Sequence, residues 1–178
     1  MNLELESPAT LKRYTAPTPT EGKQSTTSED GNAARKLLLA RRLVEAGVRY
    51  VSVSFSDFDT HSDNFPRMRH LVPIVDHALH ALVTDLDERG MLGDVSVVVW
   101  GEFGRTPRIN GQASRDHWPG CYFSIWAGAG VRTGQVIGDS DKTGSAPLTE
   151  PITPAMVGAT MMDLAGVSSA KRAEMGIL

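Results

Sequence analysis

The sequence has little cysteine, few aromatic residues and no excess of positive charge. Cys121 is the single cysteine among 178 residues, so neither an intramolecular disulfide nor a multi-cysteine zinc site can form. The formal net charge at pH 7 is −3, and this balance gives no support for nucleic-acid binding or for a polybasic membrane patch. No apolar run approaches the ~18 residues of a bilayer-spanning helix, so we expect no membrane span.

Several motifs that carry well-known chemistry are also missing. The sequence contains no GxxxxGK[ST] loop and no GxGxxG fingerprint, so we do not expect nucleotide-dependent chemistry. It has no Gly-x-Ser-x-Gly setting for a serine nucleophile, and no catalytic nucleophile can be identified. Its start has no positive-then-apolar secretory pattern, which predicts a cytoplasmic location for the chain as written.

The length fits one domain with a real core, preceded by a different kind of segment. Residues 15–31 are rich in Pro, Thr and Ser and almost free of large apolar side chains. Such a composition buries too little surface to offset chain entropy, so we expect an extended or disordered lead-in over residues 1–31. The folded domain is expected over residues 32–178.

The hydrophobic pattern predicts alternating helices and strands. Apolar spacing and flanking glycines indicate helices over 32–45, 66–89 and 154–165, and Pro73 is expected to kink or divide the second. Runs of β-branched and aromatic residues indicate strands over 48–55, 95–100, 122–127 and 135–137. The alternation, with a nearly all-apolar strand at 95–100, predicts an α/β fold with a mostly parallel sheet flanked by helices.

Polar residues follow two of these strands, where ligands bind in parallel sheets. Asp57, Asp59 and His61 come after the first strand, and Glu102 comes after the second. Carboxylate and imidazole groups two residues apart on a loop can converge on one divalent cation. The alternative is a polar turn in which Asp57 or Asp59 caps the next helix.

Two further segments carry candidate site residues. Glu102 ends an apolar strand, where a carboxylate is costly to desolvate unless a metal or an ion pair with Arg105 compensates it. Arg105 could instead contact an oxyanion. Asp116 and His117 add a carboxylate and an imidazole, the alternative being a structural histidine packed on Trp118.

Five motifs together resemble one bacterial family. In chain order they are LLARRLVEAGVRYVSVSF, FDTHSDNF, VVVWGEFGRTPRIN, RDHWPG and GAGVRTGQVIGDSD. Over residues 33–167 they resemble the family called domain of unknown function 1501, abundant in planctomycetes. That family is similar to a divergent branch of the sulfatase and alkaline-phosphatase superfamily, whose α/β members use divalent metals to hydrolyse phosphate or sulfate esters.

The resemblance implies roles for individual residues. Metal ligands would be Asp59, His61, Glu102 and His117, with Asp57 and Asp116 as neighbouring or alternative ligands and Arg105 on the anionic substrate. The metal would be zinc, manganese, calcium or magnesium. Phe103 stands where the superfamily's second ligand pair has its histidine, which departs from the full pattern.

The resemblance also implies an alkaline-phosphatase-like fold truncated at its N-terminus. The superfamily's nucleophile and first metal-binding aspartate lie in an N-terminal half, and full-length relatives are exported. We therefore expect a metal-dependent hydrolase acting on a small anionic ester. The alternatives are a non-catalytic protein that binds metal, an anion or a sulfated glycan, and an inactive fragment that needs the missing half. A half-domain would expose a sheet edge and favour self-association.

Overall fold

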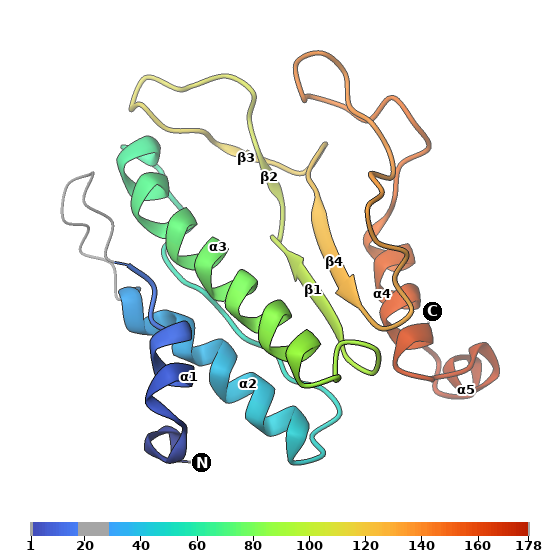
Figure 1. The fold of residues 1–178 in the computed structure, drawn as a ribbon. Coiled ribbons are helices and arrows are strands. Elements are labelled where there is room, and N and C mark those ends of the chain that lie inside the picture. Colours follow the sequence, from blue (N-terminus) through green and yellow to red (C-terminus); the bar gives the residue numbers. More distant parts are fainter. Residues whose placement is uncertain (1, 18–28, 178) are drawn as a thin grey trace. The chain divides into compact units, whose positions relative to one another are not determined.

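The computed structural model describes residues 2–17 and 29–177, which fall into two compact units (Figure 1). The first unit comprises Met1–Met91 and Arg108–Asp116. The second comprises Leu92–Pro107 and His117–Leu178. Among the described residues, none of the helices combines the length and the apolar character that crossing a membrane requires.

The first unit is helical. Its two long helices are α2 (Arg35–Glu45), which follows the 3-10 turn η2 (Gly31–Ala34), and α3 (Asn64–Glu88). They lie against each other, as Figure 1 shows. Both confirm the predicted helices, and Gly47 and Gly90 follow them at φ values of +92° and +68°. Glycine adopts these left-handed values without a steric penalty, which is why the chain leaves each helix there.

Pro73 does not divide α3, which runs through it as one helix of 25 residues. Proline lacks an amide hydrogen and therefore leaves the carbonyl of Arg69, four residues earlier, without its helical partner. Both Pro73 and Arg69 are exposed residues, so water can hydrate that carbonyl. The expected break is avoided because the proline lies on the solvent side of the helix.

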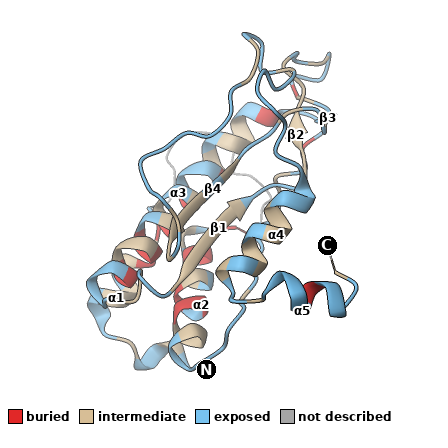
Figure 2. Cartoon of the chain, turned by 90° about the vertical axis from the view of Figure 1, so that its right-hand side faces the viewer, coloured by how far each residue is buried: buried red, intermediate tan, exposed pale blue. Residues whose placement is uncertain are grey.

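Small residues form the centre of the first unit's core. Ala33, Ala34, Ile74 and Ala78 are at most 7% exposed and form one buried cluster with Ala16. Leu37 and Phe55 pack against this cluster. Because alanine side chains are short, η2 and α3 approach each other closely here, and Figure 2 marks buried positions along these helices in red.

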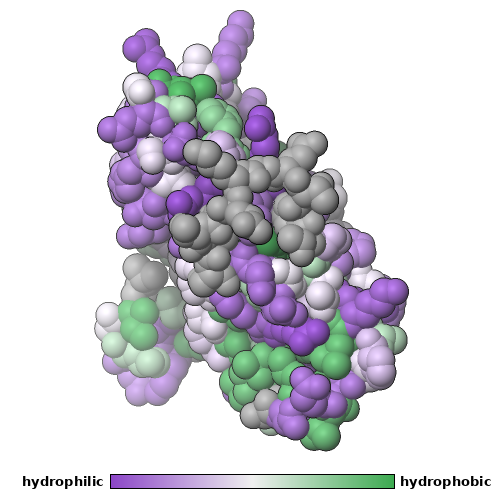
Figure 3. All heavy atoms as spheres, turned by 90° about the vertical axis from the view of Figure 1, so that its left-hand side faces the viewer, coloured by the Kyte–Doolittle hydropathy of each residue, from purple (hydrophilic) through white to green (hydrophobic). Residues whose placement is uncertain are grey.

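The N-terminal segment carries helices that the sequence analysis missed. They are the 3-10 turn η1 (Leu3–Leu5) and α1 (Pro8–Arg13), whose N-cap Ser7 accepts a hydrogen bond from the Thr10 amide. Tyr14, just after α1, has no exposed surface. These helices lie within the lead-in expected over residues 1–31, and residues 18–28 of that stretch lie outside the described residues. Figure 3 views this side, where hydrophilic residues cover most of the visible surface and hydrophobic residues gather mainly in the lower part of the view.

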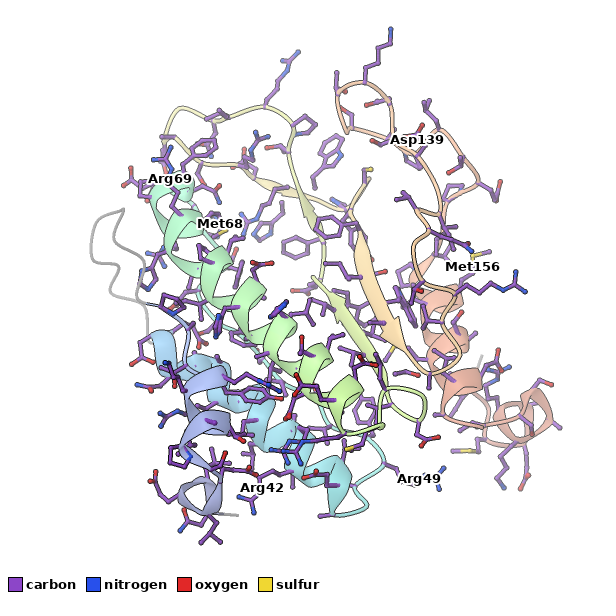
Figure 4. All side chains as sticks on the ribbon, in the orientation of Figure 1. Arg42, Arg49, Met68, Arg69, Asp139 and Met156 are labelled. Carbon is purple, nitrogen blue, oxygen red and sulfur yellow. The ribbon has the colours of Figure 1, made fainter. Side chains whose placement is uncertain are left out.

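A buried charge network joins the N-terminal segment to α2 and α3. Arg41 and Asp85, with side chains 1% and 5% exposed, form an ion pair with Nε and Oδ2 3.0 Å apart. Arg41 also pairs with Glu6 and Glu45, and Asp85 accepts hydrogen bonds from Tyr14 Oη at 3.0 Å and from Arg89 Nε at 2.9 Å. Arg42, labelled in Figure 4, pairs with Glu6 as well, at 3.2 Å. Three segments of the chain are therefore tied to one cluster of charges.

This network predicts an acid-sensitive contribution to stability from Asp85. Burial raises the pKa of Asp85. Hydrogen bonds from Arg89 and Tyr14 and the charge of Arg41 lower it by more than burial raises it, so the pKa lies below the usual value. A carboxyl with a depressed folded-state pKa contributes its full stability above the unfolded pKa of about 3.9 and loses it as the pH falls through the folded value. The difference in unfolding free energy between wild type and Asp85→Asn should therefore be largest near neutral pH and should disappear in acid. Urea unfolding at a series of pH values measures it, and a constant difference down to the lowest pH would contradict the prediction.

The second unit contains short strands and two helices. β1 (Ser96–Trp100) pairs with β4 (Ser124–Gly128), β2 (Gly104–Arg105) pairs with β3 (His117–Trp118), and both pairs are antiparallel. The helices are α4 (Pro154–Leu164) and α5 (Ser169–Glu174). α4 confirms the predicted last helix, including Thr153, whose side chain accepts a hydrogen bond from the Met156 amide. α5 is exposed except at one buried position, Arg172 (Figure 2).

The expectation of a mostly parallel sheet is therefore wrong for the described residues. A parallel pair needs a crossover connection, usually a helix, whereas β1 and β4 are joined through β2 and β3 without one. Antiparallel pairing is the arrangement that this connection permits. The apolar run of β1 suggested a strand buried on both faces, but its residues are half-buried and Trp100 is exposed.

Two predicted strands take part in no ladder among the described residues. Residues 48–55 are extended, and from Val51 to Phe55 their burial alternates residue by residue as a strand's would. Residues 135–137 are likewise unpaired, with Val136 95% exposed. Side-chain composition favours extended backbone, but a strand also needs a neighbour that supplies hydrogen bonds.

Candidate metal-binding residues

Asp59 and His61 form a close pair on the loop that leads into α3. Asp59 Oδ1 and His61 Nε2 are 3.3 Å apart, and each side chain is 66% exposed. Thr60 between them is 3% exposed. Thr60 is therefore buried, whereas both of its neighbours are exposed to solvent. The carboxylate oxygen and the imidazole nitrogen therefore lie close together at the surface of this loop.

Glu29 holds the start of this loop. Its side chain is 2% exposed, and Oε1 accepts hydrogen bonds from the amide and the hydroxyl of Ser56, both at 2.8 Å. Lys36 Nζ lies 2.7 Å from the same carboxylate. Burial raises the pKa of Glu29, but the hydrogen bonds from Lys36 and Ser56 outweigh it and keep the pKa below the usual value. The sequence analysis missed this residue because it lies within the stretch expected to be a lead-in.

The end of the loop is held by a segment from another part of the chain. The amides of Asp63 and Asn64 donate hydrogen bonds to the carbonyls of Gln112 and Ala113, both at 3.1 Å. The N-cap of α3 is Asp63, at φ 47° and without a side-chain capping bond. The alternative in which Asp57 or Asp59 caps this helix is therefore not what the structure shows.

Asp57 has a backbone conformation of its own. Its φ is +68°, in the left-handed region that Asp and Asn enter more readily than most non-glycine residues. An aspartate at this position therefore has a conformational reason as well as the ligand role that the resemblance implies. It is half-buried, unlike Asp59 and His61.

Asp116 is oriented by Asn110 within the first unit. Asn110 Nδ2 donates to Asp116 Oδ1 at 2.9 Å, and Asn110 Oδ1 accepts from the amides of Gln112 and Ser114 at 2.9 and 3.0 Å. One side chain thus shapes the turn at residues 110–114 and fixes the carboxylate that follows it. Ser114 and the carbonyls of Gln112 and Ala113 hold this segment against the loop that carries Asp59 and His61.

The second unit brings Arg105 opposite His117. They are paired positions of the β2–β3 ladder, and the rings of Phe103 and His117 lie 4.1 Å apart with an interplanar angle of 34°. Packing of His117 on Trp118 was the alternative to a ligand role; the ring contact that the structure gives for His117 is with Phe103, and Trp118 Nε1 donates to the Ser145 carbonyl at 2.7 Å. The two predicted site segments after β1 are therefore neighbours.

Gly104 permits this pairing. A Cβ atom at this position would lie 2.2 Å from the Cys121 carbonyl oxygen and 3.0 Å from that of Trp118, closer than real side chains come. Glycine is needed here because the backbone of β2 runs so close to residues 118–121. Cys121 itself is half-buried.

Glu102 differs from expectation. It lies in a bend directly after β1 and is exposed, so the desolvation argument for a metal or an ion pair at this position does not hold. In the part of the chain that the structure describes, Glu102 makes no ion pair with Arg105. An apolar strand can deliver its last polar residue straight to solvent, and composition alone does not reveal this.

Two histidines of α3 have structural partners. His70 Nε2 lies 3.1 Å from the Glu29 carbonyl oxygen, and His77 Nε2 lies 2.8 Å from that of Arg13. These bonds join α3 to the N-terminal segment. Among the predicted site residues, Asp57, Asp59, His61 and Asp116 belong to the first unit, and Glu102, Arg105 and His117 belong to the second.

Comparison with known proteins gives one family. The family model described as "Protein of unknown function (DUF1501)" matches residues 1–174, nearly the whole chain. No curated protein and no solved structure matches it.

Proposed function

The chain belongs to the DUF1501 family, and from that premise we propose that Asp59 and His61 bind a divalent cation that serves the hydrolysis of phosphate or sulfate esters. The observation that carries the proposal is the exposed pair itself, with Oδ1 and Nε2 3.3 Å apart on a loop anchored at both ends. The resemblance to the sulfatase and alkaline-phosphatase superfamily supplies the reaction class.

The donors of this pair suit a transition metal. Zinc binds carboxylate oxygen and imidazole nitrogen at about 2.0–2.2 Å, so two donors 3.3 Å apart can contact one ion. Imidazole favours zinc, whereas manganese, magnesium and calcium are suited to oxygen ligands. Glu102 and His117 are the further ligands that the resemblance implies, with Asp57 and Asp116 as alternatives.

Hydrolysis of the ester would also need groups that bind the anionic substrate and attack it. A bound divalent cation would act as a Lewis acid on the charge that develops at the phosphoryl or sulfuryl oxygens. Arg105 supplies a guanidinium, the group best suited to two-point contact with such an anion. Thr60 cannot attack the ester, because its hydroxyl is buried and accepts a hydrogen bond from Asn64 Nδ2 at 2.7 Å. The attacking group is therefore water or a hydroxyl from elsewhere.

Turnover of 4-nitrophenyl phosphate and 4-nitrophenyl sulfate tests this proposal. With zinc or manganese present we expect release of 4-nitrophenol, at least tenfold less with His61→Ala, and a raised KM with Arg105→Ala. Chelation with EDTA should abolish the reaction. No turnover of either ester by protein that demonstrably binds the metal would contradict hydrolysis.

That contradicting result would favour the second candidate, a non-catalytic protein that binds metal or a sulfated glycan. One observation supports it: Phe103, at the position implied for a ligand histidine, packs on the ring of His117. Phenylalanine cannot ligate a metal, so the superfamily's second ligand pair is incomplete in this chain. Binding of heparin that depends on the metal, without ester turnover, is the expected result for this candidate.

A further inference from the structure

Three buried polar side chains lie directly beneath the Asp59–His61 pair. Thr60 is 3% exposed, Asn64 is 7% exposed and Ser114 has no exposed surface. Asn64 Nδ2 donates to Thr60 Oγ1 at 2.7 Å, and Ser114 Oγ donates to the Thr60 carbonyl at 3.3 Å. Both bonds end on the residue that separates the two candidate ligands.

A hydroxyl at this position has a cost that an apolar side chain of the same shape would avoid. Burying a hydroxyl is unfavourable unless it is hydrogen-bonded, and each such bond adds only about 1 kcal/mol of net stability. Valine would also leave the buried Asn64 amide without its acceptor, so the hydroxyl contributes to stability as well. The hydroxyl also affects orientation. Asn64 holds the hydroxyl of Thr60 and Ser114 holds its carbonyl, and these two bonds fix the backbone from which Asp59 and His61 project.

The same three residues connect the pair to Asp116. Ser114 donates to Thr60 from the turn that Asn110 shapes, and Asn110 also holds the Asp116 carboxylate at 2.9 Å. The backbone bond from the Asn64 amide to the Ala113 carbonyl completes the junction. The segments 60–64 and 112–114, which lie about fifty residues apart in the sequence, are thereby held side by side.

We propose that Thr60 is a positioning residue, and that its buried hydrogen bonds with Asn64 and Ser114 hold Asp59 and His61 ready for a divalent cation. The inference rests on the proposed metal binding and adds the device that prepares the site. Groups that orient metal ligands typically contribute 10- to 100-fold to metal affinity.

Zinc and manganese affinities of the full chain, measured by isothermal titration at pH 7, test this inference. Thr60→Val keeps the shape but removes the hydroxyl, and we expect it to weaken binding at least tenfold. Thr60→Ser restores the hydroxyl and should bind within threefold of wild type. Tyr14→Phe is the matched control: it also removes one buried hydroxyl bond in the same unit, to Asp85, and should leave affinity unchanged while lowering the melting temperature.

The outcomes separate this inference from the proposed function. If Thr60→Val lowers the melting temperature but binds metal like wild type, Thr60 is only structural and the inference is overturned while metal binding stands. If wild type binds no metal, the proposed function fails and the inference fails with it. Should Thr60→Val not fold, Ser114→Ala decides the question, because it removes only the bond to the Thr60 carbonyl and should weaken binding at least fivefold; unchanged affinity overturns the inference.

Discussion

We expect zinc to stabilise the wild-type chain against heat, and replacement of both Asp59 and His61 with alanine should abolish this stabilisation. A ligand that binds only the folded state adds about 2.7 kcal/mol at a hundredfold excess over its Kd. For a chain of this size that corresponds to a rise of about 5–10 °C in melting temperature. The double variant should show none of it, because both donors of the exposed pair are gone. Differential scanning calorimetry with and without the metal measures the effect.

A control with the same two residue types comes from α3. Asp76 and His80 are exposed, and their replacement by alanine removes one carboxylate and one imidazole from the surface. The variant Asp76→Ala/His80→Ala should keep the full zinc shift. A shift that survives in the Asp59→Ala/His61→Ala variant, or that disappears equally in the control, would place the metal elsewhere.

Asp85→Ala should destabilise the first unit by about 3–5 kcal/mol, the cost of breaking a buried ion pair. It removes the acceptor of the hydrogen bonds from Tyr14 and Arg89 and leaves Arg41, 1% exposed, with fewer counter-charges. Glu88→Ala, one turn of helix away, removes a carboxylate that is 54% exposed and pairs with Arg13. Exposed pairs contribute less than about 1 kcal/mol, so this variant should be nearly neutral.

Urea unfolding followed by circular dichroism at 222 nm compares the two variants at pH 7. The expected result is a large fall in midpoint for Asp85→Ala and almost none for Glu88→Ala. Equal midpoints would mean that the buried network contributes no more than a surface ion pair. The helical packing of α2 and α3 would then account for the stability of the first unit.

The helices of this protein were predictable because their signals are local. The glycines after α2 and α3 and the N-cap Thr153 occur at the expected positions. Each acts within a few residues of itself, so no tertiary contact is needed to recognise it. The helix α1 carries local signals too, Ser7 as N-cap and Pro8 at its first position, but the lead-in predicted over residues 1–31 overlooked them.

Strand direction was not predictable from composition. The apolar run of β1 fits a strand in either type of sheet, and the antiparallel pairing follows from the short β2–β3 connection, whose two-residue strands carry no pattern of their own. Residues 48–55 show the opposite case, because their composition favours a strand that has no partner among the described residues. Pairing depends on which segments meet, and the order of residue types does not encode this directly.

The closeness of Asp59 and His61 was predictable from their spacing, but the residues that hold their loop in place were not. Asp59 and His61 lie as close as their spacing suggested, and the segments of Arg105 and His117 pair as neighbours. Glu29, which holds the loop of Asp59 and His61 through Ser56, is 27 residues away in sequence and belongs to none of the quoted motifs. Buried hydrogen bonds between distant residues leave no periodic signal.

Pro73 has a consequence for the motions of α3. The missing amide hydrogen interrupts the ladder of helical bonds, so the turns from Asn64 to Val72 are less tightly coupled to the rest of the helix. Their amides should exchange with deuterium through local openings that leave the turns beyond Ile74 closed. Asn64, which donates to Thr60, lies in the first of those turns. We therefore expect local opening of this segment to break the Asn64–Thr60 hydrogen bond and to free the loop of Asp59 and His61 from α3.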